Sequence, residues 1–348
     1  LLSMSYNRDD QTIKAGWARH TLGGQSNSGG DIPLVKSIGV ISASSATFDQ
    51  LWMTVGRFIN GTSLVTVEIM TSPFNSATAQ EDGYCLDGGA TYDAPARISG
   101  ITNASSCVVT APFHGFSNGD SVKIDGVIGL NSSIVDINGN ILASNFVNNK
   151  TFVVGSSGAF SFSILDFQGN ALNSTGYGPY VSDGVVRKLV TTISGLTWLK
   201  NETVGIVADG GIHPNVIVNS AGVIALSYPA AKVQIGYRYN SDGTTLRAES
   251  GAADGSSIGK LRRINRVAFL LHRVGDFSFG PDFMRLLPCE FPRADEQNAD
   301  QATPLFSGLT RDGIEAGYDF DDQLSFRQNS GLPGMVQSVT TMMDEVDV

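Results

Sequence analysis

The stretch from Leu189 to Tyr239 constrains the fold most, because short apolar runs alternate there with turn residues. Val204 to Ala208 ends at Asp209-Gly210-Gly211, and Val233 to Tyr237 ends at Asn240-Ser241-Asp242-Gly243. β-Branched runs of four to six residues, closed by Asn, Asp and Gly, predict short strands joined by tight turns. No part of this stretch has helical spacing. We therefore predict an antiparallel β domain here.

The residues before this stretch also alternate between apolar and polar positions. Gln50 to Phe58 and Leu64 to Met70 flank Asn60-Gly61, a strong signal for a hairpin turn. Strands are also expected at Ile13 to Trp17 and at Val35 to Ile41. The four strands predict a meander, enough for one propeller blade or one small sheet.

Two further regions complete the predicted organisation. Residues 75–95 are polar and rich in glycine, so we expect a linker or surface loop. From Arg97 to Lys188, charged residues become rarer, and short apolar runs predict a separate small β-barrel or sandwich inserted into the chain. Lys260 to Val274 is the most basic segment; its spacing fits a helix or a strand, and its β neighbours favour a strand. Later strands are expected at Leu305 to Gly308, Asp312 to Tyr318, Gln323 to Asn329 and Met335 to Met342.

The sequence thus predicts an all-β chain with three parts. Residues 1–95 would form a meander or propeller-like part, and residues 96–188 the inserted module. Residues 189–348 would form an antiparallel β platform.

Composition narrows the classes of function. Charged residues make up only 16% of the chain and 40 residues are glycine, whereas about 25% of a typical soluble domain is charged. This favours extracellular-type or virion β proteins over metabolic enzymes. The net charge of −10 opposes nucleic-acid binding, which needs a basic footprint. It does not exclude a surface past which DNA slides without sticking, because like charge repels the phosphate backbone.

Cysteine usage and hydropathy add two expectations. Cys85, Cys107 and Cys289 are odd in number and widely spaced. We therefore expect no disulfide framework, and folding in a reducing cytoplasm. No apolar run approaches the roughly 18 residues of a membrane span. Because the sequence begins without Met and inside a predicted strand, we expect it to be part of a longer protein.

The histidines do not suggest a metal site. The chain has four of them, none at metal-ligand spacing: His20, His114, His213 and His272. We expect His20 to pack on Trp17 in a strand, and His114 and His213 to lie in turns.

Carboxylates are plentiful at Glu81-Asp82, in the segment from Asp319 to Asp322, at Asp344-Glu345 and at Asp347. A glycosidase needs two carboxylates facing each other across a cleft, and Ca²⁺ needs several hard oxygen ligands. Adjacent Asp residues in a glycine-flanked segment are more typical of a solvated loop, which is the interpretation we prefer.

The remaining signals for catalysis are weaker. Gly255 and Gly259-Lys260 resemble part of a P-loop, but Leu261 stands where Ser or Thr is required, and the GxSxG motif of serine hydrolases is absent. We therefore predict no enzyme, no catalytic residue, no cofactor and no metal site. The basic segment from Lys260 to Arg273 fits either contact with the acidic surface of a neighbouring subunit or a solvated strand face.

The inserted module resembles the FCCH domain, a small β module first named in ubiquitin-activating enzymes that recurs in phage tail proteins. The resemblance lies in Ile101-Thr102-Asn103, Val108-Val109-Thr110, His114 to Val127, Asn149 to Val154, Gly176-Tyr177 and Gly184-Val185-Val186. The sequence departs from that pattern between Ser132 and Phe146, where it carries extra residues.

The chain outside the module resembles the tail nozzle proteins of short-tailed phages, also called tail tubular protein B or stabilisation proteins. The resemblance lies in the order and spacing of five segments: Arg8 to Thr21, Leu51 to Glu68, Leu196 to Gly210, Val233 to Tyr239 and Arg262 to Leu271. It implies a β-propeller joined to a β-rich platform, and a sixfold ring below the portal and adaptor through which DNA passes.

We therefore predict a structural virion protein, a homo-oligomeric nozzle subunit of a podovirus tail that is made in the host cytoplasm. The resemblance implies a hexameric ring that retains DNA and conducts it during ejection, with tail adaptor and fibre proteins as partners. The alternative is a receptor- or glycan-binding tail fibre or adhesin, in which aromatic side chains stack on sugars. A capsule depolymerase is a third interpretation.

Overall fold

The computed structural model describes residues 1–7, 14–42, 49–131, 145–247, 251–252, 255–256, 260–291 and 302–346. These residues form several antiparallel sheets and no α-helix, which confirms the all-β prediction. Two single-turn 3₁₀ helices occur, η1 (Gln80–Asp82) and η2 (Thr197–Leu199). No helix in the described ranges has the length and hydropathy of a membrane span.

The N-terminal strands form two separate sheets rather than the predicted four-stranded meander. β1 (Leu2–Asn7) pairs only with β2 (Lys14–Arg19), whereas β3 (Leu34–Ile41), β4 (Gln50–Ile59) and β5 (Thr62–Ile69) form a sheet in that order. The reason is that the chain between β2 and β3 leaves the hairpin and packs against other elements. The Asn60-Gly61 hairpin is confirmed, because both residues adopt the positive φ angles, 49° and 74°, of a tight β-turn.

The module is a twisted sheet of seven strands, in the order β7-β15-β10-β12-β13-β9-β8, with a small β11-β14 ribbon beside it. Alternate residues point inward to one core that includes Val122, Ile124, Phe152, Phe162 and Ile164. No sheet closes on itself in the described parts of the chain. The predicted extra residues lie mostly at 132–144, outside the described residues. The strands are β7 (Pro95–Arg97), β8 (Gly100–Ile101), β9 (Val108–Thr110), β10 (Ser121–Asp125), β11 (Ile128–Gly129), β12 (Lys150–Ser157), β13 (Ser161–Leu165), β14 (Tyr180–Ser182) and β15 (Val185–Lys188).

The central sheet combines one strand that precedes the module in the sequence with three strands that follow it. Its order is β18-β17-β20-β6, and β6 (Asp87–Asp93) comes from the segment predicted to be a linker or loop. That prediction was wrong for these residues because their glycines permit close strand pairing: a Cβ on Gly89 would lie 1.7 Å from the Ile235 carbonyl oxygen. The other strands of the central sheet are β17 (Thr203–Ala208), β18 (Gly211–Ile217) and β20 (Lys232–Tyr237). A separate two-stranded sheet consists of β16 (Val190–Ile193) and β19 (Ile224–Ala230).

The C-terminal part packs two sheets around an aromatic core. β24 (Leu261–Val274) is a strand, as predicted, and lies between β27 and β29. Phe269 on β24 packs edge-on against Phe277, with 4.8 Å between ring centroids. The strand predicted at Asp312 to Tyr318 is wrong, because β27 ends at Gly313 and the chain then turns back towards β24. The remaining strands are β21 (Ser241–Thr244), β22 (Gly251–Ala252), β23 (Gly255–Ser256), β25 (Ser278–Gly280), β26 (Leu287–Pro288), β27 (Phe306–Gly313), β28 (Ser325–Gln328) and β29 (Met335–Val346).

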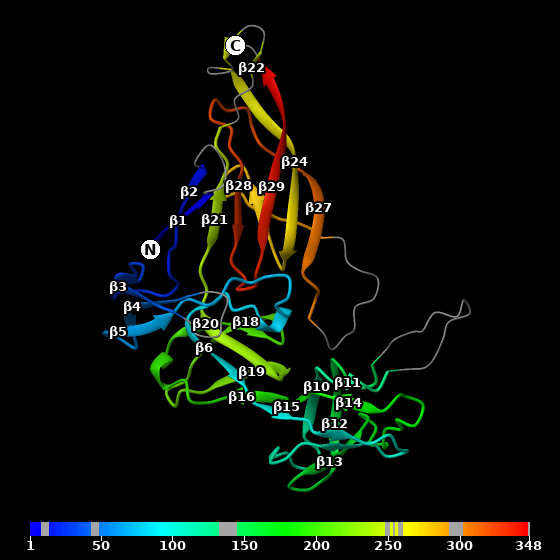
Figure 1. Ribbon diagram of the computed structural model, residues 1–348. Coiled ribbons are helices and arrows are strands. Elements are labelled where there is room, and N and C mark those ends of the chain that lie inside the picture. Colours follow the sequence, from blue (N-terminus) through cyan, green and yellow to red (C-terminus); the bar gives the residue numbers. More distant parts are fainter. Residues whose placement is uncertain are drawn as a thin grey trace, which may run out of the picture.

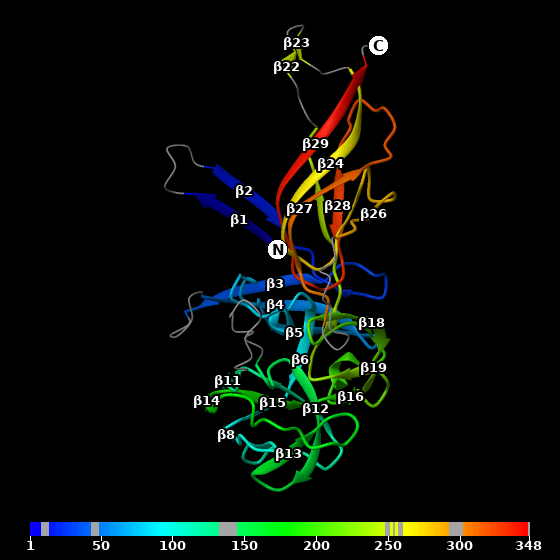
Figure 2. The same cartoon turned by 90° about the vertical axis from the view of Figure 1, so that its right-hand side faces the viewer.

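The parts follow one another along a long axis (Figures 1 and 2). The C-terminal sheets lie at one end and the module at the other, with the β3–β5 sheet and the central sheet between them. The β1–β2 hairpin projects sideways beside the C-terminal sheets in Figure 2. The junction where these parts meet is therefore the place at which their relative positions are fixed.

Because the module has its own core, Phe162→Ala should unfold it selectively. Phe162 is 1% exposed, and removing a buried Phe side chain costs about 3–5 kcal/mol. Hydrogen exchange should rise in β9 to β13 and stay unchanged in β24. Phe167→Ala is the matched control, since Phe167 is 68% exposed and its loss should change stability by less than about 0.5 kcal/mol. Equal loss of protection in β24 would contradict an independent module core.

Candidate functional site

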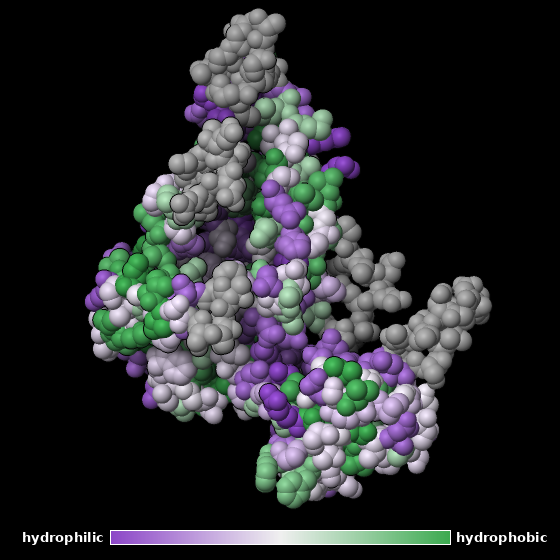
Figure 3. Space-filling model, viewed as in Figure 1, coloured by the Kyte–Doolittle hydropathy of each residue, from purple (hydrophilic) through white to green (hydrophobic). Residues whose placement is uncertain are grey.

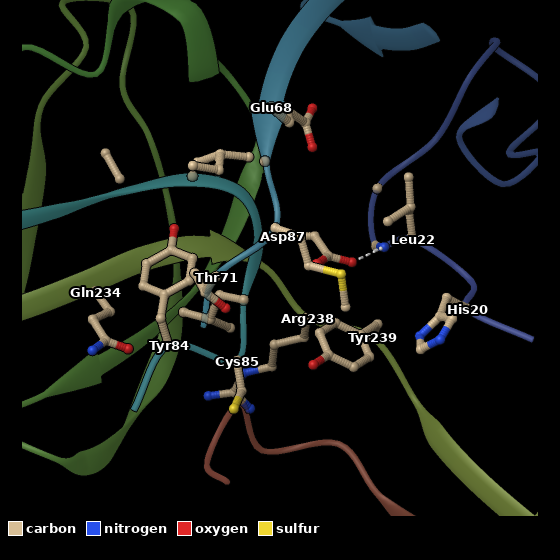
Figure 4. Close-up of a pocket in the computed structure, with 18 of the residues that line it drawn as sticks. His20, Leu22, Glu68, Thr71, Tyr84, Cys85, Asp87, Gln234, Arg238 and Tyr239 are labelled. Carbon is tan, nitrogen blue, oxygen red and sulfur yellow. Dashed lines mark hydrogen bonds between the residues drawn. The ribbon is translucent and has the colours of Figure 1, made fainter. Parts of the chain in front are cut away.

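The main cleft of the molecule lies at the junction and has a volume of about 1410 Å³. Four segments line it: the chain after β2, strand β5, the stretch from Asp82 to Asp93, and the chain from Arg238 to Asp242 that leaves β20. Figure 4 shows their side chains converging around Asp87. The cleft brings together segments that are far apart in sequence.

A buried ion pair adjoins the cleft, and its acidic member, Glu68, lines it. Arg57 on β4 is 1% exposed, and its guanidinium donates two hydrogen bonds to Glu68 on β5, at 2.5 and 2.8 Å. A third bond runs from Arg57 Nη1 to the Gly23 carbonyl at 2.7 Å. The guanidinium also lies 5.4 Å from the ring centroid of Tyr237 on β20. One side chain thus connects the chain after β2, the β3–β5 sheet and the central sheet.

A glycine on β6 leaves the space that the Arg57 guanidinium occupies. Gly88 on β6 has a φ of 57°, and a Cβ at this position would lie 2.7 Å from Arg57 Cζ. A residue with a side chain would therefore be strained and would also collide with the guanidinium. The strand alternation explains why both charges point inward, because Arg57 and Glu68 occupy the same face of the β4–β5 pair.

Asp87 is the cleft residue with the most strongly perturbed carboxyl group. Burial raises its pKa to about 6, and the negative charge of Glu68 adds to this effect. The Gly23 amide, which donates to Asp87 Oδ2 at 2.8 Å, and the charge of Arg57 act in the opposite direction. The carboxyl faces the backbone of the chain after β2, so it fastens that chain to β6.

Three other groups near Asp87, one thiol and two phenols, favour their neutral forms. Burial, followed by the charge of Asp87, raises the pKa of the Cys85 thiol to about 11. Burial likewise raises the pKa values of Tyr84 and Tyr239. A neutral thiol is a poor nucleophile, and phenols with raised pKa values are poor general bases at neutral pH. Among these four groups, only the carboxyl of Asp87 has a pKa close to neutral pH.

Each of the four histidines has a different environment. His20 follows β2 and bonds to Ser3 at 2.7 Å on the face opposite Trp17, so the predicted packing on Trp17 was wrong. His114 does follow a turn, but it is buried against Phe116 and Phe162. His272 lies on β24, opposite Met335 of β29.

His213 was predicted to lie in a turn, and this prediction was wrong. It is a fully buried residue of strand β18. Its Nε2 accepts a hydrogen bond from the Ser227 amide at 2.8 Å, and its Nδ1 lies 2.8 Å from the Pro214 carbonyl oxygen. The proton therefore resides on Nδ1, and the ring joins β18 to β19. The sequence pattern missed this because Pro214 suggests a turn, although proline is tolerated on an edge strand such as β18.

The acidic segment from Asp319 to Asp322 was predicted to be a solvated loop, but it is also hydrogen-bonded to the backbone of β24. Asp319 exchanges backbone hydrogen bonds with Arg262, at 2.8 and 2.9 Å. Asp322 is 6% exposed and accepts a bond from the Ile264 amide. Asp319 and Asp321 are nonetheless exposed, and Asp321 pairs with Arg247 at 3.0 Å.

The other predicted acidic groups are dispersed. Asp82 pairs with Lys232, the Glu81 carbonyl accepts a bond from Gln234, and Asp344 pairs with Arg263 at 3.2 Å. The Glu345 side chain and Asp347 lie outside the described parts. The described residues contain no group of three or more His, Cys, Asp or Glu side chains that could hold a metal ion.

The remaining predicted segments are also separated from the cleft. Gly255 belongs to the two-residue strand β23, and Gly259 lies outside the described residues. The basic segment does not form one surface, because Arg262 is buried and Arg273 donates to the Asn75 and Thr78 carbonyls at 2.5 and 2.8 Å. The three cysteines are free thiols, Cys85 half-buried and the other two buried.

Sequence reasoning missed Arg57, Glu68 and Asp87, the residues that build the junction. A signal existed for the first two, because each is a charged residue at an inward position of an alternating strand. Nothing in the sequence pattern indicated that Asp87 would meet Gly23.

Comparison with known proteins adds no assignment. The chain matches no protein-family model, and no curated protein resembles it at a significant level. Function must therefore be argued from the surfaces and the junction themselves.

Replacing Arg57 by Met should loosen the junction. The change leaves the Glu68 carboxylate buried without its partner, which costs about 3–5 kcal/mol. Hydrogen exchange in β4, β5 and β6 should increase accordingly. The double variant Arg57→Met/Glu68→Leu is the matched control and should recover part of the loss, because it leaves no unpaired charge. A double variant as unstable as the single one would show that packing, and not charge, dominates.

Asp87→Asn should stabilise the protein near neutral pH. The pKa of Asp87 is about 6 when folded, against an ordinary value of 3.8, so ionisation costs more in the folded state. Its contribution to stability is therefore greatest below about pH 4 and is lost as the pH rises to about 6. Asn still accepts the Gly23 bond and should recover about 2–3 kcal/mol at pH 7.5, measured by urea denaturation.

The matched control for this variant is Asp93→Asn on the same strand. Burial opposes ionisation of Asp93, but the hydrogen bond and charge of Arg187, and then Lys232, outweigh it and lower its pKa. Asp93→Asn should therefore destabilise at neutral pH. Stabilisation by both variants would indicate a general effect of negative charge instead of a specific effect at Asp87.

Proposed function

We propose that this chain is a structural subunit of a phage tail nozzle, which assembles into a ring and conducts DNA. The observation that carries the proposal is an apolar sheet face that the rest of the described chain leaves uncovered. The resemblance of five segments to tail nozzle proteins supplies the identity of the assembly.

The uncovered face belongs to the β3–β5 sheet. The strand register places Leu34, Gly56 and Val65 in one row, Ser37, Thr54 and Val67 in the next, and Gly39, Trp52 and Ile69 in the third. Leu34 is 59% exposed, Val65 53%, Val67 68% and Ile69 43%. Figure 3 shows hydrophobic residues gathered over this sheet. The opposite face carries Arg57 and packs on the junction there, while Ile38 and Val40 on the β3 part of that face are 59% and 65% exposed.

The size of this face is that of an interaction surface. Three strands about 4.8 Å apart, with eight residues rising about 3.3 Å each, span roughly 350 Å². This footprint lies within the range of the largest apolar patch on a typical monomer, about 300–600 Å², which is often functional. We propose that a further sheet covers this face, as neighbouring blades do in a β-propeller.

The β1–β2 hairpin also requires a partner. Met4 pairs with Trp17, and both lie with Leu2 on one face, where they are 47%, 70% and 65% exposed. The opposite face carries Ser3 and Ala18. An isolated two-stranded hairpin is only marginally stable in water, so this apolar face favours contact with another sheet in the assembled tail.

The electrostatics suit a channel for DNA. The net charge of −10 repels the phosphate backbone and limits sticking. In the proposed assembly the nozzle lies in the virion tail, contacts adaptor and fibre proteins, and forms from subunits made in the host cytoplasm. The free thiols of Cys85, Cys107 and Cys289 are compatible with folding in that reducing compartment.

Cryo-electron microscopy of purified tails tests the assignment directly. The expected result is density for this chain in a ring on the tail axis. Density at the periphery, or a chain present in one copy, would contradict it. Native mass spectrometry separates the six copies implied for a nozzle from the three typical of the alternative, a receptor- or glycan-binding tail fibre.

Val67→Glu should weaken assembly without unfolding the chain. Val67 is 68% exposed, so a charge there is solvated in the free subunit and buried only on contact. We expect the ring population to fall at least about tenfold in native mass spectrometry, since a buried unpaired charge costs several kcal/mol. Val181→Glu in the module, at 65% exposure, is the matched control and should assemble normally.

A further inference from the structure

Two phenylalanines of the module lie side by side on its surface. Phe113 is 83% exposed and Phe160 is 57% exposed, and their ring centroids are 5.4 Å apart in an edge-to-face arrangement. They come from two loops, one before β10 and one between β12 and β13. Neither ring contributes to the module core, so their exposure is not a by-product of core packing.

The backbone holds the first ring outward at a conformational cost. Phe113 has a φ of 58°, which a bulky residue rarely adopts. Two hydrogen bonds maintain it: the Phe113 amide donates to the Ala159 carbonyl at 3.0 Å, and the Ala111 amide donates to the Phe160 carbonyl at 2.9 Å. Strain of this kind persists where the surroundings impose it and is concentrated at functional sites.

An aromatic cluster lies next to the pair along the chain. Its members, His114, Phe116 and Phe162, have ring centroids 4.8 to 5.5 Å apart. His114 is held because its Nδ1 accepts a bond from the Phe116 amide at 3.0 Å. The backbone that carries the exposed rings is therefore joined directly to the packed part of the module.

The surroundings of the pair are polar and uncharged. Residues 111–119 and 155–163 include no Asp, Glu, Lys or Arg. The Ser157 amide and hydroxyl bond to Asn118 and to the Phe116 carbonyl, both at 2.8 Å, which ties the two loops together. Ser117 and Ser156 are exposed beside them, and the space next to Gly115 and Gly119 is open.

These features select a class of ligand. A phosphate-bearing ligand would need nearby cations, which the two loops lack. A stable protein interface buries about 800 Å² per partner, whereas one aromatic side chain supplies about 150–250 Å². A neutral sugar fits better, because the C–H face of its ring packs on aromatic rings while its hydroxyl groups bond to Ser and Asn. We propose that the Phe113–Phe160 pair binds neutral carbohydrate.

The proposal does not depend on the tail assignment, since it rests on the module alone. Isothermal titration of the full chain with maltohexaose, cellohexaose and hexa-N-acetylchitohexaose, all neutral, tests it. We expect at least one of these oligosaccharides to bind, with an affinity that is the same at low and high salt. Binding of none of them, or binding that weakens strongly with salt, would overturn the proposal.

Variants locate the site. Phe113→Ala and Phe160→Ser should each weaken binding about tenfold or more, as expected for loss of one aromatic contact. Phe160 has ordinary backbone geometry, so its variant remains informative if the Phe113 variant misfolds. Phe167→Ala, at another exposed position of the module, should bind within about twofold of the unmodified chain. Unchanged binding by a folded Phe160→Ser variant would overturn the assignment of the site.

Discussion

The buried guanidinium of Arg57 is the interaction on which the arrangement of the chain depends. A charge that is withdrawn from water must be fully paired, and Arg57 meets this requirement through Glu68, the Gly23 carbonyl and the ring of Tyr237. These partners come from three different parts of the chain. None of them alone satisfies the guanidinium, so the three parts are stabilised in one mutual position.

This coupling holds the β3–β5 sheet against the central sheet. The β3–β5 sheet presents an apolar face outward, while its other face is joined to the central sheet through Arg57. A shift of one sheet relative to the other would separate the buried guanidinium from the ring of Tyr237. In the C-terminal part, Asp319 and Asp322 hold their loop against β24, because both hydrogen-bond to the backbone of this strand.

The sequence predicted local structure better than long-range structure. The Asn60-Gly61 turn and the β24 strand follow from the φ angles and the alternation of a few adjacent residues, and both are confirmed. The strand at Asp87 to Asp93 was predicted as a loop because its glycines resemble a linker, and only pairing with β20, more than a hundred residues later, makes it a strand. His213 and Asp322 were misjudged for the same reason, since their hydrogen-bond partners, Ser227 and Ile264, are brought to them by the fold. The junction residues could be suspected from charges at inward strand positions, but their partners could not.

The way in which the module joins the chain has a consequence for the strands outside it. Its entering strand β7 and leaving strand β15 are antiparallel neighbours, with Pro95 opposite Arg187, and Arg187 is bonded to Asp93 at 2.6 Å. Cα atoms of such neighbours are only about 5 Å apart. A tight turn could therefore join the two ends without displacing β6 or β16. The chain enters and leaves the module at one place, so the length of the segment between β7 and β15 does not constrain the spacing of the strands outside it.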